Sequence, residues 1–409
     1  MSRAAPWVFA LAVFVIHAIS PMRVQSDSIW NVPVALSVLH HGDFTLDEYT
    51  DALAKTEHGV DHRERHAYNT FPVGASLVAL PFLAIAELVP NQRWQSNVHA
   101  EGALQLGFFD TTEVLLGSMC VAVSVLFVLF AARARAVHRA TPWLVAMVVA
   151  FASPAWSTAS RSLWQHGPAM LFLAAAIWAW LAPPRKTGVL LGALLACAFV
   201  CRPTAAIPIL AILLAVSLTD RRRLPFVTLG AVVIAAPWVW LNFSIWGEVL
   251  PPYYLPSRLE GGSFFEALAG NLVSAGRGLL IFCPLLLLVI KGARRDAFTA
   301  VALGVLVVHW VTISRFPHWW AGHSFGPRLF TELTPFWALL LAPWLDGLFV
   351  QHRWRSFGGV VTALLLSCTL LIHARGALSK RPWGWNTTPV NIDERPDRVW
   401  DFRDLQFLR

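Results

Sequence analysis

Long apolar runs, separated by short polar turns, dominate the pattern of hydrophobic and polar positions along the chain. About 20 apolar residues cross the hydrocarbon of a bilayer as a helix. Eleven runs approach that length, near residues 6–22, 112–132, 142–158, 168–182, 188–201, 204–219, 225–242, 278–290, 297–314, 331–350 and 357–373. The pattern therefore predicts an all-α polytopic membrane protein with a bundle of about 11 transmembrane helices.

The polar turns between these runs alternate between basic and basic-poor. The basic ones hold the clusters Arg133 to Arg139, Arg185 to Lys186, Arg221 to Arg223, Lys291 to Arg295 and Arg353 to Arg355. Because basic turns stay in the cytoplasm, we expect the N-terminus inside and the C-terminus outside. The predicted parts are a catalytic module over 1–242 with a first extracytoplasmic loop over 21–111, a second module over 243–373 with acceptor-side loops, and an extracytoplasmic tail over 374–409.

Two apolar segments of the first loop are predicted to lie in the membrane interface. Residues 71–89 are apolar enough to span, but a single crossing there would put Arg133 outside. Pro72, Gly74 and Pro81 interrupt this segment, which favours an interfacial or re-entrant helix. Residues 32–39 place their apolar side chains at helical spacing, with Gly42 as a plausible C-terminal cap.

Composition agrees with a membrane protein and excludes several functional classes. The chain is 56% hydrophobic and 14% charged, whereas soluble domains carry about 25% charged residues. The net charge of +8 comes from the basic turns and indicates topology rather than nucleic-acid binding. The sequence has no Asp-x-Asp, phosphate-loop or dinucleotide motif, so we expect no cofactor, no metal and a donor drawn from the membrane.

Asp27 is the first candidate for chemistry, because it follows the first apolar run within a few residues. Ionisable groups at a membrane edge are costly to desolvate and are often functional. A helix cap or a solvated loop carboxylate explains the position of Asp27 equally well. Nearby, His58, His62 and His66 have a spacing that would align three imidazoles on a helix for zinc. Gly59 weakens such a helix, so a solvated, pH-responsive loop is favoured.

Several basic and aromatic side chains fall in the predicted outer turns. A guanidinium at headgroup depth suits a phosphate, although ordinary lipid headgroups would also satisfy it. Aromatic rings stack on sugars but also form interfacial belts. The candidate phosphate-binding residues are Arg161, His166, Arg202, Arg277 and Arg328, and the candidate sugar- or acceptor-binding residues are His318, Trp319, Trp320 and His323.

The order of these features resembles the GT-C glycosyltransferases, and most closely the branch of lipid A aminoarabinose transferases and protein O-mannosyltransferases (glycosyltransferase family 39). The resemblance rests on four features in order: Asp27 after the first span, the segment Ser37 to Phe44 with its Gly-Asp, the segment Asn69 to Gly74, and the segment Leu191 to Pro203, in which the apolar run ends at Arg202. It covers roughly the N-terminal half. The chain departs from the family where Ser28 follows Asp27 in place of an acidic residue, and where His166 replaces a second acidic residue.

The resemblance implies an inverting transfer of a sugar from a polyprenyl-phosphate donor to an acceptor hydroxyl on a glycolipid, cell-envelope glycan or protein. Asp27 would be the catalytic base, and the lipid bilayer, the lipid-linked sugar and the acceptor would be the partners. The expected location is the bacterial cytoplasmic (inner) membrane, with the site on the extracytoplasmic face. A lipid-linked oligosaccharide polymerase or ligase is the alternative enzyme, and a lipid or sugar transporter is a third, less favoured reading.

Overall fold

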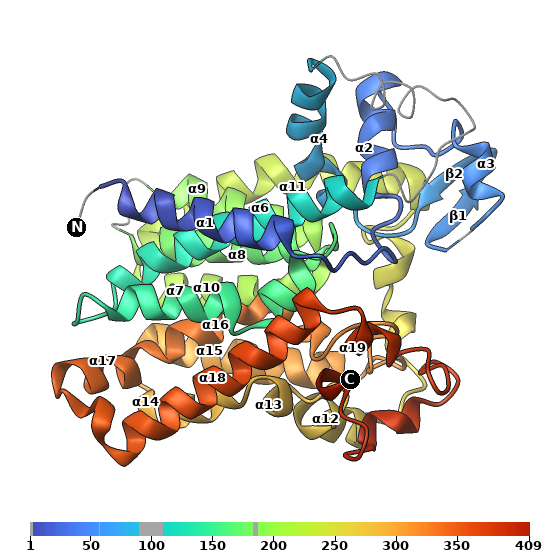
Figure 1. Ribbon diagram of the computed structural model, residues 1–409. Helices are drawn as coiled ribbons and strands as arrows, with labels where there is room; N and C mark the ends of the chain where they lie inside the picture. Colours follow the sequence, from blue (N-terminus) through green and yellow to red (C-terminus); the bar gives the residue numbers. More distant parts are fainter. Residues whose placement is uncertain (1–2, 57, 90–108, 183–186) are drawn as a thin grey trace.

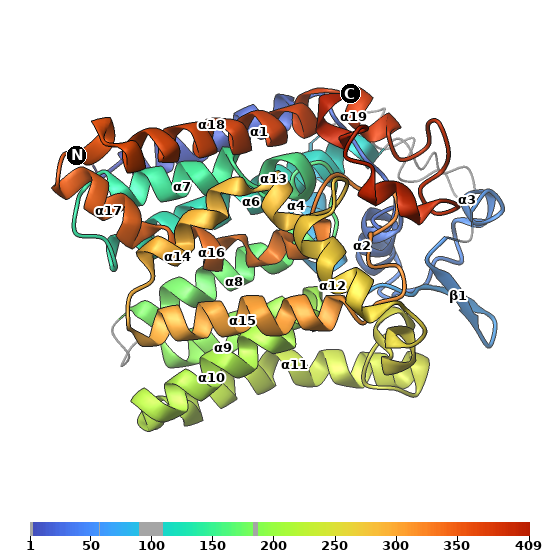
Figure 2. The ribbon, with the colours of Figure 1, turned by 90° about the horizontal axis from the view of Figure 1, so that it is seen from below.

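In the computed structural model, which describes residues 3–56, 58–89, 109–182 and 187–409, long helices lie side by side along one direction (Figures 1 and 2). The bundle contains α1 (Ala5–Ile19), α6 (Asp110–Arg133), α7 (Thr141–Phe151), α8 (His166–Leu181), α9 (Gly188–Cys201), α10 (Ala206–Thr219), α11 (Leu224–Trp246), α15 (Ala297–Ile313) and α18 (Phe357–Leu378). Each begins within a few residues of a predicted apolar run and ends near that run's end, except that α7 stops at Phe151 and the rest of the run 142–158 continues as a short π-helical segment, Ala155–Ala159. The all-α polytopic class is thereby confirmed.

The length and apolar composition of a helix determine whether it can cross a membrane. Within the described residues, four helical stretches are long and apolar enough to cross a membrane alone, namely Asp110–Arg133, Arg221–Trp246, Arg328–Val350 and Phe357–Leu378, and nine further apolar helices have 10–17 residues. The run at 278–290 is not one regular helix. It divides into α13 (Leu279–Phe282), a 3-10 segment (Pro284–Leu288) and α14 (Val289–Gly292), because Pro284 cannot donate the hydrogen bond that would continue the first turn.

The run at 331–350 is also divided. It forms a 3-10 segment (Arg328–Leu333) followed by α16 (Thr334–Leu340) and α17 (Ala342–Val350), and it crosses the hydrophobic core. Elsewhere, glycines allow helices to touch: a Cβ on Gly192 would lie 1.8 Å from the carbonyl oxygen of Val227, and one on Gly230 would lie 2.0 Å from that of Val189. Close α9–α11 contact through small residues is typical of helices in membranes.

The first loop forms a separate layer across one end of the bundle. It contains α2 (Asn31–His40), α3 (Thr50–Leu53), the antiparallel hairpin of β1 (Val60–Arg63) and β2 (His66–Asn69), and α4 (Gly74–Glu87). Figure 1 shows α2 and α4 standing crosswise to the long helices, so α4 does not run along the bundle. Residues 90–108 of the predicted loop lie outside the described residues.

Local sequence explains the ends of these crosswise helices. Gly42 follows α2 with a φ of 79°, a conformation that glycine adopts without a Cβ penalty. Its N–H donates to the carbonyl of Ser37 at 3.1 Å. Gly74 begins α4 where a Cβ would come within 2.5 Å of the backbone of Cys201. This contact seats α4 directly on the end of α9, next to Arg202.

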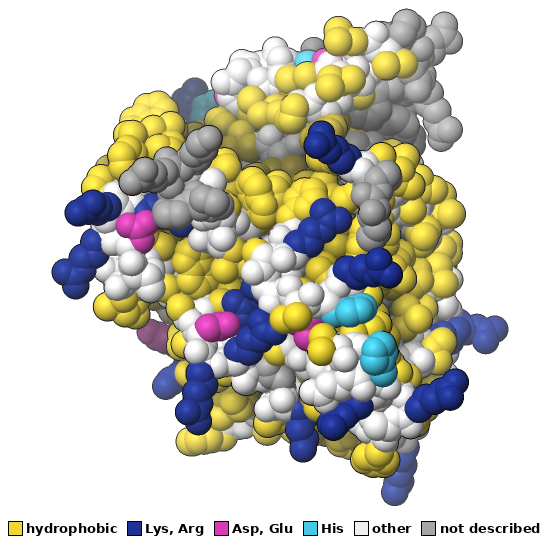
Figure 3. Space-filling view, turned by 90° about the vertical axis from the view of Figure 1, so that its left-hand side faces the viewer, with side chains coloured by type: hydrophobic (Ala, Val, Ile, Leu, Met, Phe, Trp, Pro, Cys, Tyr) yellow, Lys and Arg dark blue, Asp and Glu magenta, His cyan; other side chains and the backbone are white. Residues whose placement is uncertain are grey.

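The two ends of the bundle differ in charge. The turns after α6, α10 and α17 meet at one end, which Figure 3 shows from outside with Lys and Arg predominating over acidic side chains. The first loop, α12 (Phe264–Val273), α19 (Arg381–Gly384) and the rest of the 374–409 segment gather at the other end (Figure 1). One hydrophobic core runs through both predicted modules, from Val13 to Trp383.

Candidate functional site

Two cavities meet at Asp27, at the end of the bundle that carries the first loop. The first, of about 250 Å³, is mostly apolar and lies between the start of α10, the end of α15 and the 250–259 loop. The second, of about 710 Å³, has polar and apolar lining in nearly equal parts; this more polar cavity, called the polar cavity below, lies between the first loop, the 316–329 loop and the 374–409 segment. The residues that line both are Asp27, Tyr253, Arg258, Phe316, Arg328 and Leu329. Asp27 therefore stands on the boundary between an apolar and a polar compartment.

The Asp27 carboxylate is held by a guanidinium and an imidazole. Its Oδ2 accepts a hydrogen bond from Arg328 at 3.0 Å, and its Oδ1 lies 3.2 Å from Nε2 of His58. Burial opposes ionisation, but Arg328, His58 and the Ser26 hydroxyl together hold the pKa of Asp27 well below its usual range. The side chain keeps 21% of its surface exposed, so an ionised carboxylate is accessible from the cavities.

The backbone around Asp27 is fixed by a buried carboxylate, that of Glu113 at the start of α6. Its two oxygens accept hydrogen bonds from Gln25 at 3.0 Å, from the Ser162 hydroxyl at 2.8 Å and from the Leu163 N–H at 3.2 Å. Asn31 adds a bond to the Leu163 carbonyl at 2.8 Å. The 25–31 segment is thereby tied to the turn before α8.

Arg161 belongs to this framework rather than to a cavity wall. It is fully buried and donates to the carbonyl oxygens of His17, Ser20 and Met22, at the end of α1, at 2.5, 3.0 and 3.2 Å. These bonds satisfy carbonyls that the end of a helix leaves without intrahelical partners. Arg161 was predicted to bind a phosphate because of its predicted depth in the membrane. In the structure its guanidinium instead binds backbone carbonyl oxygens.

Beneath the apolar cavity lies a buried charged cluster built around Glu332. Its Oε1 accepts from Nε of Arg202 at 2.6 Å, and its Oε2 lies 2.7 Å from Nδ1 of His166. Nε2 of His166 lies 3.4 Å from a terminal nitrogen of Arg202, and His309 lies 3.8 Å from Glu332. A carboxylate holding one edge of a guanidinium leaves its other edge free to bind an anion.

Arg202 offers that free edge to the cavity. Among the described residues its second terminal nitrogen has no hydrogen-bond partner, and Arg202 lines the cavity together with Thr204. Arg202 and His166 were predicted from the sequence as phosphate-binding residues, whereas Glu332 was not predicted. The missed signal was a carboxylate at the start of an apolar run, because an unpaired charge at that depth is strongly disfavoured.

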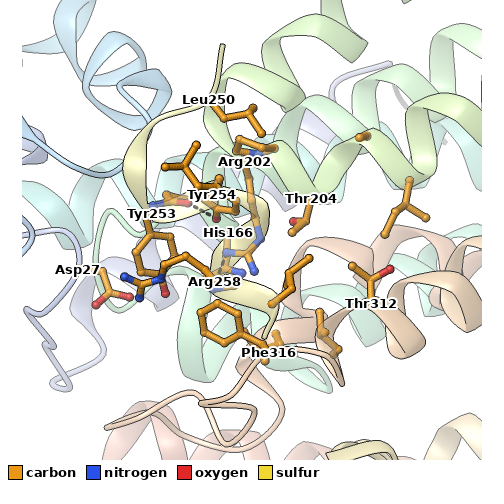
Figure 4. Close-up of a pocket in the computed structure, with 18 of the residues that line it drawn as sticks. Asp27, His166, Arg202, Thr204, Leu250, Tyr253, Tyr254, Arg258, Thr312 and Phe316 are labelled. Atoms are coloured by element: carbon orange, nitrogen blue, oxygen red, sulfur yellow. Dashed lines mark hydrogen bonds between the residues drawn. The ribbon is translucent and has the colours of Figure 1, made fainter. Parts of the chain in front are cut away.

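The 250–259 loop closes the apolar cavity and was also missed. Tyr254 donates to Oε1 of Gln165 at 2.6 Å, and the Arg258 guanidinium lies 4.9 Å from the ring centre of Tyr253. Arg258 has no ion-pair partner within the described ranges. Figure 4 shows Tyr253, Arg258 and Asp27 on one side of the cavity and Thr204 and Thr312 on the other. The loop has neither a hydrophobic periodicity nor a motif that would have predicted its position facing Asp27.

An apolar groove continues from the first cavity along the bundle. Ile207 lines both the cavity and a groove between α10 and α15. The groove is walled by apolar side chains such as Leu210, Leu214 and Val301, and it contains Gly304, where a Cβ would meet open space. The geometry thus joins a cationic pocket to an apolar groove between α10 and α15.

The remaining basic and aromatic candidates divide between the polar cavity and the protein interior. His318, His323 and Arg328 line the polar cavity. Arg277 is buried and donates to the carbonyls of Trp320 and Gly322, so it is directed into the loop packing. Trp319 is 3% exposed in a small core with Trp385 and Val399 of the 374–409 segment, and Trp320 packs beside that core.

His58, His62 and His66, whose spacing would align them on a helix, do not lie on one helix face. His58 lies before β1 and bonds Asp27, His62 lies in β1, and His66 lies in β2 at 2.5 Å from Asp47. Within the part of the chain that the structure describes, no group of three His, Cys, Asp or Glu is placed to hold a metal ion. The loop is a hairpin, and pairing with Asp27 raises the pKa of His58.

Comparison with known proteins finds similarity of fold rather than of sequence. No family model and no curated protein matches the chain. Among solved structures, ArnT from Cupriavidus metallidurans bound to undecaprenyl phosphate is 13% identical with a TM-score of 0.55, covering 100% of this chain and 76% of that one.

The oligosaccharyltransferase of Archaeoglobus fulgidus is similar in two states. The form tethered to an acceptor peptide is 11% identical with a TM-score of 0.55, and the apo form is 10% identical with a TM-score of 0.53. This chain is covered to 98% and 96%, and it spans 59% and 60% of those chains. Both neighbours are GT-C proteins, so this chain has the fold of the GT-C membrane glycosyltransferases, as its sequence resemblance predicted.

Proposed function

We propose that this protein transfers a sugar from a polyprenyl-phosphate donor to an acceptor hydroxyl, with inversion at the sugar carbon. The single observation that carries the proposal is the position of Asp27, an ionised carboxylate at the junction of an apolar and a polar cavity. A lipid-linked donor and a polar acceptor need compartments of these two kinds, and the reacting atoms must meet where they join. The fold shared with GT-C transferases supports the same reading.

The apolar cavity suits the donor. Its groove between α10 and α15 matches an isoprenoid chain, which needs only apolar contact, while Arg202 and Arg258 face the cavity with free N–H groups. Such groups bind a phosphate through charge-assisted hydrogen bonds. ArnT, the first neighbour described above, was solved with undecaprenyl phosphate bound. We therefore assign Arg202 and Arg258 to the lipid phosphate, whereas Arg161 and Arg277 hold the surrounding loops.

The polar cavity suits the acceptor. It is lined by hydrogen-bonding side chains from three separate segments, including His58, His318 and His323. An acceptor hydroxyl entering from this side reaches Asp27 opposite the donor. Attack from the face opposite the leaving phosphate inverts the sugar carbon.

The residues around the two cavities account for each bond that forms or breaks in the proposed transfer. Asp27 accepts the acceptor's proton while the acceptor oxygen bonds to the sugar's anomeric carbon, a role that requires a heavy-atom reach of ~2.6–3.2 Å. The bond from that carbon to the phosphate oxygen breaks, and its electron pair leaves with the polyprenyl phosphate. Arg202 and Arg258 stabilise the charge that develops on the leaving group. Arg328 keeps the Asp27 carboxylate ionised and oriented.

The basic turns at the opposite end of the bundle (Figure 3) bear on location. Placed in the cytoplasm by the positive-inside rule, they put Asp27 on the extracytoplasmic face. We propose the bacterial cytoplasmic membrane as the location, with a glycolipid, envelope glycan or protein as the acceptor.

The test is incubation of purified protein with a panel of polyprenyl-phosphate sugars and candidate acceptors, followed by mass analysis of the products. Release of free polyprenyl phosphate together with an acceptor heavier by one sugar is the expected result. Products that grow by whole oligosaccharides would favour a polymerase or ligase instead. Movement of the intact lipid-linked sugar across proteoliposomes, without release of the phosphate, would favour a transporter and overturn the proposal.

A further inference from the structure

The 374–409 segment reaches the site through one buried side chain, Gln406. Its amide oxygen accepts from a terminal nitrogen of Arg277 and from the N–H of Gly326, each at 3.0 Å. Its amide nitrogen donates to the carbonyl of Ser324 at 2.8 Å. Gln406 is 0% exposed, and its amide oxygen and nitrogen are both in use. A buried amide with both ends satisfied fixes the groups around it, since losing either bond leaves a polar atom without water.

The bonds of Gln406 continue to Asp27 without a break. The Gly326 N–H is held by Gln406, the Gly326 carbonyl accepts the Arg328 N–H at 2.9 Å, and the Arg328 guanidinium holds Asp27 at 3.0 Å. Gly326 has a φ of 58°, and a Cβ there would lie 2.5 Å from the Phe282 ring. The turn that aims Arg328 is therefore tight, glycine-dependent and clamped by Gln406 from one side.

Arg277 completes the clamp. Its five N–H groups all donate to oxygens: the carbonyls of Trp320, Gly276 and Gly322, and the side chains of Gln406 and Asn386. Two acceptors come from the 374–409 segment and two from the loop that leads to Arg328. Because all of its N–H groups donate to these segments, the Arg277 guanidinium links the two loops to each other.

We infer that Gln406 is a positioning residue of the transfer reaction, acting through Gly326 and Arg328 to set the Asp27 carboxylate. The 374–409 segment is then a working part of the site rather than a separate tail. This inference rests on the proposed role of Asp27. Gln406 lines neither cavity among the described lining residues, so it acts on the reaction through the residues that it holds, and the proposed route runs through Gly326 and Arg328.

The experiment combines a stability cycle with a pH profile. In Gln406→Ala the turn at Gly326 loosens and Arg328 holds Asp27 less firmly. We expect the thermal unfolding midpoint to fall by about 2 °C more in the native background than in Asp27→Asn, where the ion pair is already absent. We also expect the acidic limb of kcat/KM to move up by about one pH unit, because a nearby guanidinium lowers an Asp pKa by ~1–3 units.

The controls separate the possible failures. Leu408→Ala changes an exposed neighbour of Gln406 and should leave both readouts unchanged. Gln406→Glu keeps the oxygen that Arg277 and Gly326 use, so it should fold and give intermediate shifts even if Gln406→Ala does not fold. Additive midpoints in the cycle, or an unmoved acidic limb in an active Gln406→Glu, would overturn the inference. The midpoints need no transfer activity, so they test Gln406 even if the protein transfers no sugar.

Discussion

Asp27 and Arg328 lie 301 residues apart in the sequence, yet their side chains are joined by a hydrogen-bonded ion pair of 3.0 Å. The pair connects the segment after α1 to the start of the run that carries Glu332. Both side chains line both cavities. The ion pair therefore joins the two halves of the chain at the site. The orientation of the proposed base is thus a property of the whole bundle.

Asp27→Asn should abolish sugar transfer while the protein stays folded. The amide cannot accept the acceptor's proton, and general-base catalysis typically contributes 10²–10⁴-fold. The measurement is the rate of polyprenyl phosphate release, with thermal unfolding as the check on folding. Asp51→Asn, at an exposed position of α3, is the matched control and should transfer at the native rate. Native activity in Asp27→Asn would exclude this carboxylate as the base.

Arg258→Ala should weaken donor binding without loss of stability. Arg258 lines both cavities and is exposed at the protein surface, so its removal disturbs little packing. A hydrogen bond to a charged group contributes ~1.5–3 kcal/mol, which corresponds to a rise of about 10- to 100-fold in the donor KM. Arg222→Ala removes an exposed arginine from the opposite end of the bundle and should leave the donor KM unchanged. If both variants raise KM equally, the effect is one of net charge.

The Asp27–His58 pair predicts a pH dependence of stability. Pairing raises the pKa of His58 above its ordinary 6.5, so its contribution to stability is complete below pH 6.5 and is lost as the pH rises through the higher value. The pKa of Asp27 is lowered, so its contribution persists down to acidic pH. We expect the difference in unfolding midpoint between native protein and His58→Gln to shrink from pH 6 to pH 8. A difference that is constant over this range would contradict a protonated His58 at Asp27.

The sequence predicted the bundle because the free energy of membrane insertion depends on local apolar runs. Each predicted run matches a helix or a broken helix, and the interfacial or re-entrant placement of 71–89 stays a prediction. The site was harder because its contacts are distant in sequence: Arg202 and Glu332 are 130 residues apart. Arg161 and Arg277 were predicted to bind phosphate only because they lie near the predicted headgroup depth. A sequence does not tell whether a guanidinium at that depth binds a phosphate or backbone carbonyls. The 250–259 loop has no periodicity that would place it.

Glu332→Gln should damage both stability and donor binding. Glu332 is 1% exposed and holds Arg202 and His166. Breaking a buried pair by removing one partner costs ~3–5 kcal/mol, because the remaining charge is left uncompensated. We expect a lower unfolding midpoint and a raised donor KM, measured side by side. Glu260→Gln, at the exposed residue that follows the 250–259 loop, is the control. A stable Glu332→Gln with an unchanged KM would show that Arg202 needs no carboxylate to hold its position.

The groove between α10 and α15 makes a prediction about donor length. Gly304 lines this groove and its missing side chain faces open space, so Gly304→Leu would fill the channel without a clash. Leucine also favours the helix over glycine by ~1 kcal/mol, so the variant should fold. We expect a raised KM for donors with long isoprenoid chains and an unchanged KM for donors of one or two isoprene units, measured in detergent solution. Gly347→Leu fills equally open space in α17 and should affect neither donor. If Gly304→Leu treats long and short donors alike, the isoprenoid chain lies elsewhere on the protein.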